Sequence, residues 1–276
     1  MQLIRLNQYL ASCGVCSRRA ADELIRQGEV TIDGRIAQVG DKVSGEERIV
    51  VSGRAVHGGE RRIVVAYYKP VGVTVTDSDP HAEVTLRDVF HYPERLTYAG
   101  RLDKDSEGLL LMTNDGQLVD KMMRGRAGHE KEYIVRVRGK ITDEDLERLS
   151  KGIWLPDLRV KTKPCKVTRL GEDTFRIVLT QGLNRQIRRM CHTVGRDVKQ
   201  LKRVRVLTVM LGGLKPGEMR ELSAEEIAKL MKACEKPARN ARSGEQASAA
   251  RNSQSKEQAA SARDTGNGTR RKRFYG

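Results

Sequence analysis

Aromatic side chains are scarce in this sequence of 276 residues. Phe, Trp and Tyr together make up 4% of it, with a single Trp. A protein so poor in rings cannot bind nucleic acid mainly by stacking bases, so any affinity for a polyanion must come from charged groups. Such groups are abundant, because 52 Lys and Arg face 36 Asp and Glu, a formal net charge of +16. This charge attracts polyanions, but by itself it does not distinguish RNA, DNA and acidic membrane surfaces.

Long apolar runs and a cysteine framework are also missing. No segment approaches the roughly 18 apolar residues of a membrane span, and the first residues do not begin a secretion signal. We therefore expect a cytoplasmic protein with no membrane partner. The five cysteines are an odd, scattered set, as is typical of reduced thiols. Cys13 and Cys16 form a lone C-x-x-C without a second ligand pair nearby, so no metal site is expected.

Shifts of pattern divide the chain into four segments. Residues 1–53 predict an α-α-turn-β unit, and residues 54–61 predict a linker because they contain paired glycines and charge without an apolar period. Residues 62–234 mix strands with helices at hairpin-like spacing, which favours an α+β domain with a mixed, mainly antiparallel sheet. Residues 235–276 form a basic tail that we expect to be disordered, because they cannot bury enough apolar surface.

The small unit carries clear local signals. Ser17 is placed to cap the second helix, and Asp33-Gly34 is typical of a two-residue hairpin turn. Basic residues gather on its helices and hairpin, where an RNA backbone could lie across them, although an ordinary solvated surface explains them equally well. The candidates are Arg5, Arg18, Arg19 and Arg35.

The most informative stretch is Gly100–Gly108, a glycine-bounded turn before an apolar strand. It contains Asp103 and Asp105 beside Arg101 and Lys104. Loops at the ends of rigid strands often hold catalytic groups. These residues alone do not exclude a charged surface turn, in which the carboxylates simply pair with their basic neighbours.

A second constellation lies at residues 184–194, where helical spacing sorts the side chains into two faces. One face is apolar and the other carries three guanidiniums, which repel one another unless nearby anions neutralise their charges. An RNA phosphate or a catalytic carboxylate would meet that need. The apolar face consists of Ile187, Met190, Cys191 and Val194, and the polar face of Arg185, Arg188, Arg189 and His192.

Tyr133 enters a predicted strand amid alternating charges. A core aromatic is the simpler interpretation. An enzyme that extracts a base from a stack, however, needs an aromatic or apolar surface to receive it, and few other rings are available.

These segments, taken in order, resemble a known family. Residues 5–7, 16–22 and 28–34 resemble the RNA-binding module named after ribosomal protein S-four. Residues 68–72, 100–108 and 184–190 resemble the motifs of the RsuA/RluB/RluE/RluF family of bacterial rRNA pseudouridine synthases. Asn7, Asp33, Tyr68 and Ser106 depart from the usual residues. Residues 100–106, 129–133 and 181–191 are most similar to the RluF branch of this family, which modifies 23S rRNA and can also act on a tRNA.

The resemblance implies an S-four-like module followed by a pseudouridine synthase domain that needs no cofactor. It implies that a monomer isomerises one uridine of 23S rRNA, with a tRNA as a further substrate. Asp103 is then the catalytic aspartate, Tyr133 packs on the flipped base, and Arg188 pairs with the aspartate. Arg101, Arg185 and Arg189 would contact RNA.

Two other functions remain open from the residues alone. A non-catalytic RNA-binding or ribosome-assembly factor would explain the charge and the small module. A metal-dependent nuclease could use Asp103 and Asp105, although no second carboxylate cluster with metal-ligand spacing accompanies them.

Overall fold

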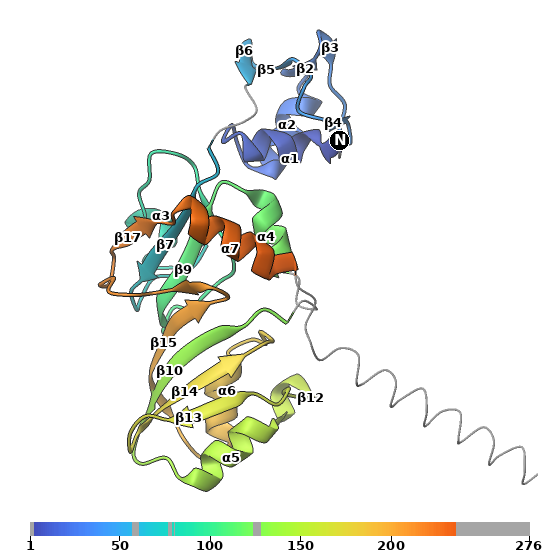
Figure 1. Ribbon diagram of the computed structural model, residues 1–276. Helices are drawn as coiled ribbons and strands as arrows, with labels where there is room; N and C mark the ends of the chain where they lie inside the picture. The colour runs from blue at the N-terminus through green and yellow to red at the C-terminus, as the bar shows by residue number, and fades with distance from the viewer. Residues whose placement is uncertain (1–2, 57–60, 77–78, 80, 124–127, 236–276) are drawn as a thin grey trace, which may run out of the picture. The chain divides into compact units, whose positions relative to one another are not determined.

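The computed structural model describes residues 3–56, 61–76, 79, 81–123 and 128–235. Its N-terminal module is built around a small apolar core that includes Leu6, Leu10, Ile25 and Ile49. Two helices and two small sheets surround this core (Figure 1). The elements are β1 (Ile4–Arg5), α1 (Leu6–Ser12), α2 (Arg18–Arg26), β2 (Val30–Ile32), β3 (Arg35–Ile36), β4 (Lys42–Val43), β5 (Ile49–Val51) and β6 (Arg54–Val56).

Two local predictions for the module are confirmed. The hydroxyl of Ser17 accepts a hydrogen bond from the Ala20 backbone N–H at 3.1 Å and so caps α2. Asp33 and Gly34 have φ angles of 49° and 83°, as a type I′ turn requires, and they join β2 to β3.

The linker predicted for residues 54–61 is wrong at its start. Residues 54–56 form strand β6, which pairs antiparallel with β5. Ser52 and Gly53 both have positive φ, 48° and 79°, so they form a second two-residue hairpin turn rather than a domain boundary. Gly53, at the predicted end of the module, thus reverses the chain into a further strand of the same sheet. Residues 57–60 lie outside the described part of the chain.

The larger domain contains a nine-stranded sheet with the order β13-β14-β10-β15-β9-β7-β17, to which β8 and β16 add at β9 and β15. Only β15 and β9 run parallel; the other strand pairs of this sheet within the described residues are antiparallel. The α+β fold class is therefore confirmed. The elements are β7 (Val64–Lys69), α3 (Leu86–Val89), β8 (Thr97–Tyr98), β9 (Glu107–Thr113), α4 (Gly116–Met123), β10 (Lys131–Val137), α5 (Asp143–Lys151), β11 (Trp154–Leu155), the 3-10 turn η2 (Pro156–Leu158), β12 (Val160–Lys161), β13 (Lys166–Arg169), β14 (Thr174–Leu179), α6 (Gln186–Thr193), β15 (Val198–Val206), β16 (Val209–Met210), β17 (Met219–Glu221) and α7 (Ala224–Glu235).

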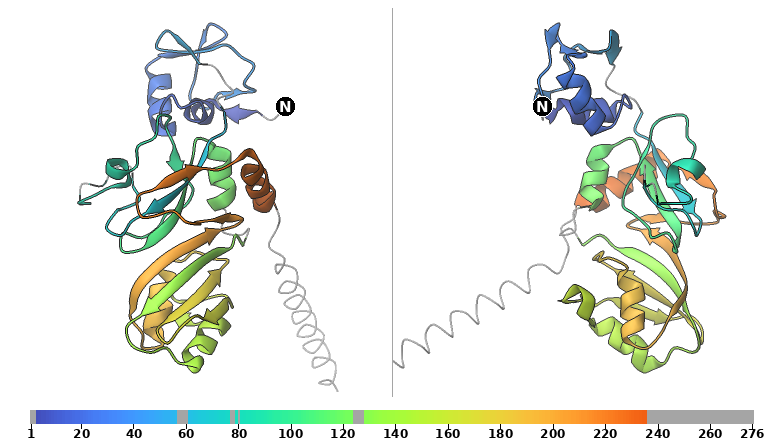
Figure 2. Two further views of the ribbon diagram at one scale, coloured as in Figure 1. Left: turned by 60° about the vertical axis from the view of Figure 1, so that its left-hand side comes forward. Right: turned by 180° about the vertical axis from the view of Figure 1, so that it is seen from behind.

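Helices cover the two halves of this sheet separately (Figures 1 and 2). In the half formed by β7 and β9, Leu118 of α4 and Leu230 of α7 are fully buried against the strands. In the half formed by β10 and β14, Leu149 of α5 and Met190 of α6 complete the core. The half-sheets meet where β9 lies beside β15, and the loop that precedes β9 lies at this junction.

The last helix begins with the capping box that the sequence predicts. The Glu226 backbone N–H donates to the Ser223 hydroxyl at 3.2 Å, and Glu226 accepts from the Ser223 backbone N–H at 2.9 Å. Helix α7 includes Glu235, the first residue of the predicted tail; residues 236–276 lie outside the described part of the chain.

The capping glutamate gives a stability prediction with a defined pH dependence. The Arg220 side chain, then the Ser223 backbone, hold the pKa of Glu226 down at about 2, against an ordinary 4.5. A depressed carboxyl pKa stabilises the fold above pH 4.5, and this contribution disappears as the pH falls toward 2. Because the side chain is 38% exposed, we expect Glu226→Gln to cost only about 1 kcal/mol at pH 7. Urea unfolding of both proteins between pH 3 and pH 7 should show this difference shrinking in acid; a constant difference would contradict the assignment.

Candidate functional site

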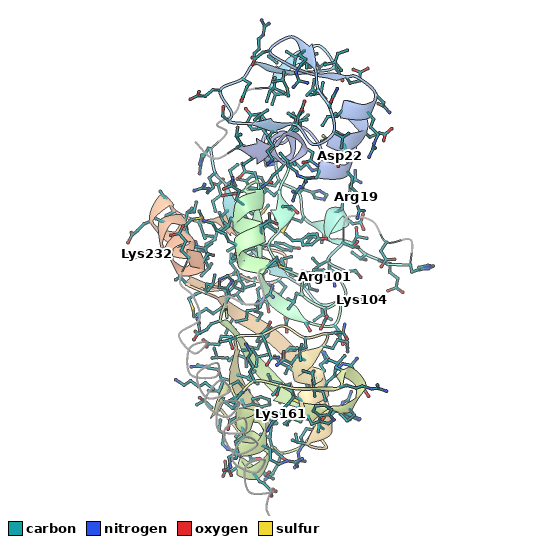
Figure 3. The ribbon with its side chains drawn as sticks, turned by 90° about the vertical axis from the view of Figure 1, so that its right-hand side faces the viewer. Arg19, Asp22, Arg101, Lys104, Lys161 and Lys232 are labelled. Carbon is teal, nitrogen blue, oxygen red and sulfur yellow. The ribbon has the colours of Figure 1, made fainter. Side chains whose placement is uncertain are left out.

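A cleft of about 380 Å³ opens at the junction of the two half-sheets. This volume is within the range of about 300–1,000 Å³ that is typical of sites for small groups. The loop before β9 forms one wall, and its residues Arg101 and Lys104 are labelled in Figure 3. The start of β10 and the segment from β14 into α6 form the others. The lining residues are Gly100, Arg101, Leu102, Asp103, Ser106, Met122, Met123, His129, Lys131, Tyr133, Leu179, Thr180, Gln181, Gly182, Leu183, Asn184, Arg185, Gln186, Ile187, Leu201 and Arg203.

Asp103 is the one carboxylate among the described residues that line this cleft. Its side chain is half-buried, and Tyr133 lines the same cleft from strand β10. The ring of Tyr133 packs against both apolar cores that flank the cleft. The structure therefore brings together the two residues that the sequence singled out on separate segments.

A buried arginine fixes the backbone on one side of Asp103. Arg203 on β15 is 3% exposed, and its guanidinium donates to the carbonyl oxygens of Leu109 at 2.7 Å and Arg101 at 3.2 Å. In the register of the parallel strand pair, Arg203 lies opposite Gly108. The loop that precedes β9 is thus anchored to the strand that joins the half-sheets.

A buried lysine fixes the other side. Lys69, at the end of β7, is fully buried and donates to the carbonyl oxygens of Pro70 at 2.7 Å, Val73 at 2.8 Å and Lys104 at 3.4 Å. Burial lowers the pKa of Lys69 to about 8, and only part of this effect is offset by nearby carboxylates, among them Asp103. The loop therefore has a rigid backbone and a positive environment beneath its carboxylate.

The predicted ion pair between Asp103 and Arg188 is wrong. Arg188 instead contacts Asp105, with its Nε 3.2 Å from a carboxylate oxygen and one terminal nitrogen donating to the Asp105 carbonyl oxygen at 2.6 Å. Its other terminal nitrogen donates to the carbonyl oxygen of Val198 at 3.3 Å. The guanidinium thus pairs with Asp105, the loop residue that faces α6, and not with Asp103.

Arg185 joins Arg188 at Asp105. Its two terminal nitrogens donate to the two carboxylate oxygens of Asp105 at 2.9 and 2.7 Å, a bidentate pair. Burial raises the pKa of Asp105, but the hydrogen bond from Arg185 and the charge of Arg188 outweigh it and hold that pKa below its usual value. Asp105 therefore ties the loop before β9 to the start of α6.

We expect Asp105→Asn to loosen this tie without removing the reacting group. The neutral amide cannot form ion pairs with the two guanidiniums. The free energy of unfolding should therefore fall, by only about 1 kcal/mol because the site is partly exposed. Any activity that depends on the loop should fall by about 10- to 100-fold, because a displacement near 1 Å can have that effect. Asp157→Asn is the matched control, because Asp157 pairs with Arg189 of α6 outside the cleft. Equal losses in both variants would refute the positioning role of Asp105.

The helix predicted for residues 184–194 is shorter than expected. Helix α6 spans Gln186–Thr193, and Arg185 is its N-cap with a left-handed backbone, φ 48°. This conformation turns the Arg185 side chain toward Asp105 and the cleft instead of along the helix. The predicted apolar face is confirmed, because Ile187, Met190, Cys191 and Val194 are all buried.

Arg189 does not line the cleft. Its guanidinium forms an ion pair with Asp157 and donates to the Asn184 carbonyl oxygen at 3.1 Å. The intramolecular partners explain how three neighbouring guanidiniums are accommodated on one short helix: two meet Asp105 and the third meets Asp157.

The basic residues predicted on the module differ in how far they are engaged. Arg35 forms an ion pair with Asp41 at 2.9 Å. Arg5, Arg18 and Arg19 are exposed and form no ion pair within the described residues. Arg19 is labelled in Figure 3, on α2. These three side chains therefore remain available for an anionic partner.

Sequence reasoning missed three basic residues at the site, Lys69, Lys131 and Arg203. Each lies in a strand, where a charged residue usually indicates a side chain exposed to solvent. One signal was present, because Lys131 precedes Tyr133 by two positions and so shares its side of β10. His129, also lining the cleft, hydrogen-bonds through Nδ1 to the Met122 carbonyl oxygen at 3.1 Å, while its buried Nε2 has no hydrogen-bond partner among the residues that the structure describes.

Two features are absent from the described residues. No group of three or more His, Cys, Asp or Glu side chains is arranged to hold a metal ion. Among the same residues, no helix has the length and apolar character needed to cross a membrane.

Comparisons with known proteins agree with this geometry. Residues 63–193 match the family model described as RNA pseudouridylate synthase, and residues 4–49 match the S4 domain. The chain is 41% identical, over 88% of its length and 84% of the relative's, to the dual-specificity RNA pseudouridine synthase RluF of Shigella flexneri. It is 37% identical to the ribosomal large subunit pseudouridine synthase B of Bacillus subtilis, over 82% of this chain and 95% of that protein. A crystal structure of pseudouridylate synthase matches with a TM-score of 0.60 and 30% identity, over 82% of this chain and 99% of that one.

Proposed function

Because the chain belongs to the RsuA/RluB/RluE/RluF family of bacterial RNA pseudouridine synthases, we propose that it isomerises one uridine of 23S rRNA in the cytoplasm, with Asp103 as its catalytic carboxylate. A tRNA is a further substrate in this proposal, since relatives at 41% identity are named dual-specificity enzymes. The observation that supports the role of Asp103 most directly is its place as the one carboxylate among the described residues of a cleft otherwise lined by basic, neutral polar and apolar side chains.

The reaction breaks the bond between uracil N1 and ribose C1′, turns the ring, and rejoins it through C5. The uridine must leave its stack for these steps, and Tyr133 offers the ring on which the flipped base can pack. Asp103 then acts at the sugar, either as a nucleophile at C1′ or as a base at C2′. Both routes need an ionised carboxylate in a place from which water is largely excluded.

Positive side chains surround that carboxylate in the proposed mechanism. Arg203 and Lys69 lie buried beside the loop and, among the described residues, form no ion pair, so no carboxylate in direct contact neutralises their charges. Arg188 contributes through Asp105, as a positioning residue. In this respect the proposal replaces the direct pair that the sequence suggested.

The remaining arginines would hold the RNA. Arg101 is exposed at the cleft, and Arg185 can exchange its surface ion pair with Asp105 for a phosphate. Arg189 forms its ion pair with Asp157 outside the cleft, so it would contribute only to the positive electrostatic potential around the cleft. On the module, the exposed arginines of β1 and α2, which are Arg5, Arg18 and Arg19, would contact the RNA backbone. Arg35 would join them from the β2–β3 hairpin. The enzyme is proposed to act as a monomer.

Mapping of pseudouridine tests the substrate. Ribosomal RNA and tRNA are compared from cells that contain the gene, cells that lack it, and lacking cells supplied with the Asp103→Asn form. The proposal predicts one position in 23S rRNA that is modified only in the presence of the active gene, and one in a tRNA. An unchanged map would favour a non-catalytic assembly factor, and chelator-sensitive cleavage of the RNA would favour a nuclease.

A further inference from the structure

The cleft contains more positive charge than one aspartate accounts for. Arg101, Lys131, Arg185 and Arg203 line it together with Asp103. Arg203 is committed to two backbone carbonyl oxygens, Arg185 is bound to the carboxylate of Asp105, and the Arg101 side chain is exposed. Three of the four cations therefore have partners or face the solvent.

Lys131 is the exception. Its ammonium makes one long hydrogen bond, 3.5 Å to the His129 carbonyl oxygen, and it forms no salt bridge within the described residues. An ammonium has three hydrogen-bond donors, so at least two of them are uncommitted. Burial, then the charge of Arg203, lowers the pKa of Lys131, and no carboxylate compensates for them. Even a half-buried cation without an anion is costly unless an anion arrives during function.

The strand geometry places this ammonium on the side of the cleft where the base should lie. Lys131 and Tyr133 are two positions apart on β10 and both line the cleft, whereas Glu132 between them pairs with Arg205 at 2.8 Å on the opposite side. The pairing of β10 with β14 is regular through these residues, Lys131 lying opposite Leu179 and Tyr133 opposite Ile177. A ring that packs on Tyr133 therefore has Lys131 as its neighbour along the strand.

The reaction supplies the missing anion. When the N1–C1′ bond breaks, the bonding electron pair stays with the uracil, and its negative charge is shared with the ring carbonyl oxygens. This holds whether Asp103 bonds to C1′ or removes a proton from C2′. We propose that Lys131 is a catalytic residue that donates a hydrogen bond to a carbonyl oxygen of the departing uracil and stabilises this anion. The C5 atom then bonds to C1′ as the Asp103–C1′ bond breaks or, on the other route, as C2′ regains its proton from Asp103. The C5 proton is lost to water, N1 takes up a proton, and the Lys131 ammonium keeps its own protons throughout.

This inference rests on the proposed function, and a leaving-group experiment can separate the two. Purified wild-type and Lys131→Met proteins are given target RNA that carries either uridine or 5-fluorouridine at the modified position, under single-turnover conditions. Fluorine makes uracil a better leaving group, so cleavage of the fluorinated substrate depends less on a hydrogen bond that stabilises the uracil anion. We expect Lys131→Met to slow consumption of the uridine substrate by about 10²- to 10³-fold and that of the fluorinated substrate by at least tenfold less.

Two variants complete the test. Lys131→Arg keeps the charge, so it should recover most of the rate on uridine and show no preference for the fluorinated substrate. Lys140→Met is the matched control, because Lys140 is exposed and pairs with Glu172 away from the cleft; its rates should equal those of the wild type. Equal slowing of both substrates by Lys131→Met, or no slowing of either, would overturn the role of Lys131. Failure of the wild-type protein to form pseudouridine would overturn the proposed function itself.

Discussion

Replacement of Asp103 by Asn is expected to abolish pseudouridine formation while leaving the protein folded and able to bind RNA. The amide has nearly the same size but can neither attack C1′ nor take a proton from C2′ at a useful rate. A loss of at least about 10²-fold in the single-turnover rate follows from removal of such a group, and a loss beyond detection is consistent with an essential nucleophile. Digestion of the RNA to nucleosides and quantification of pseudouridine measures this effect.

The Asn substitution also removes the only carboxylate charge among the described residues of a positive cleft. RNA affinity should therefore be maintained or slightly increased, because phosphate no longer meets a nearby negative charge. Asp197→Asn is the control: Asp197 is exposed and lies outside the cleft, so its substitution should change neither binding nor rate. Normal isomerisation by Asp103→Asn would remove Asp103 from the mechanism.

Replacement of Gly108 by Ala is expected to have the largest effect on the fold. Gly108 has φ +105°, which residues with a side chain rarely adopt, and a Cβ there would lie 2.3 Å from the Arg203 carbonyl oxygen and 2.8 Å from the Arg203 nitrogen. These are backbone atoms of the neighbouring strand, so they cannot move aside without opening the parallel pair that joins the half-sheets. We expect a loss of about 3 kcal/mol or more in the free energy of unfolding.

Gly116→Ala is the matched control for this substitution. Gly116 begins α4, has no positive φ, and has open space where a Cβ would lie. There the change should be neutral or stabilise the protein by up to about 1 kcal/mol, through a less flexible unfolded chain. Denaturant unfolding of both variants provides the comparison. A Gly108→Ala protein as stable as Gly116→Ala would show that the close approach of β9 and β15 does not constrain this position.

Local features were predictable from the sequence because neighbouring residues decide them. The Ser17 cap, the Asp33-Gly34 turn and the Ser223 capping box each depend on hydrogen bonds or φ angles within a few positions. The hairpin at Ser52-Gly53 was missed for the opposite reason: the same two residues are compatible with a linker, and only the pairing of β6 with β5 decides between them.

The internal arrangement of the site could be predicted only in part. Asp103 and Tyr133 were identified from their segments, and the fold places them in one cleft. The carboxylate that pairs with Arg188 could not be predicted from the sequence. Asp103 and Asp105 are only two positions apart, and which of them meets Arg188 depends on which side of the loop faces α6. Lys69 and Arg203 were missed because their burial results from the sheet junction, which forms between strands about 95 residues apart in sequence.

Release of the C5 hydrogen measures the central claim most directly. A uridine that is rejoined to ribose through C5 must lose the hydrogen at that carbon, so RNA labelled with tritium at uridine C5 releases tritium to water in step with isomerisation. Purified wild-type protein, with no cofactor added, should release one tritium per modified site, and the Asp103→Asn protein should release none. Tritium release by both proteins alike, or by neither, would contradict an aspartate-dependent isomerisation in this cleft.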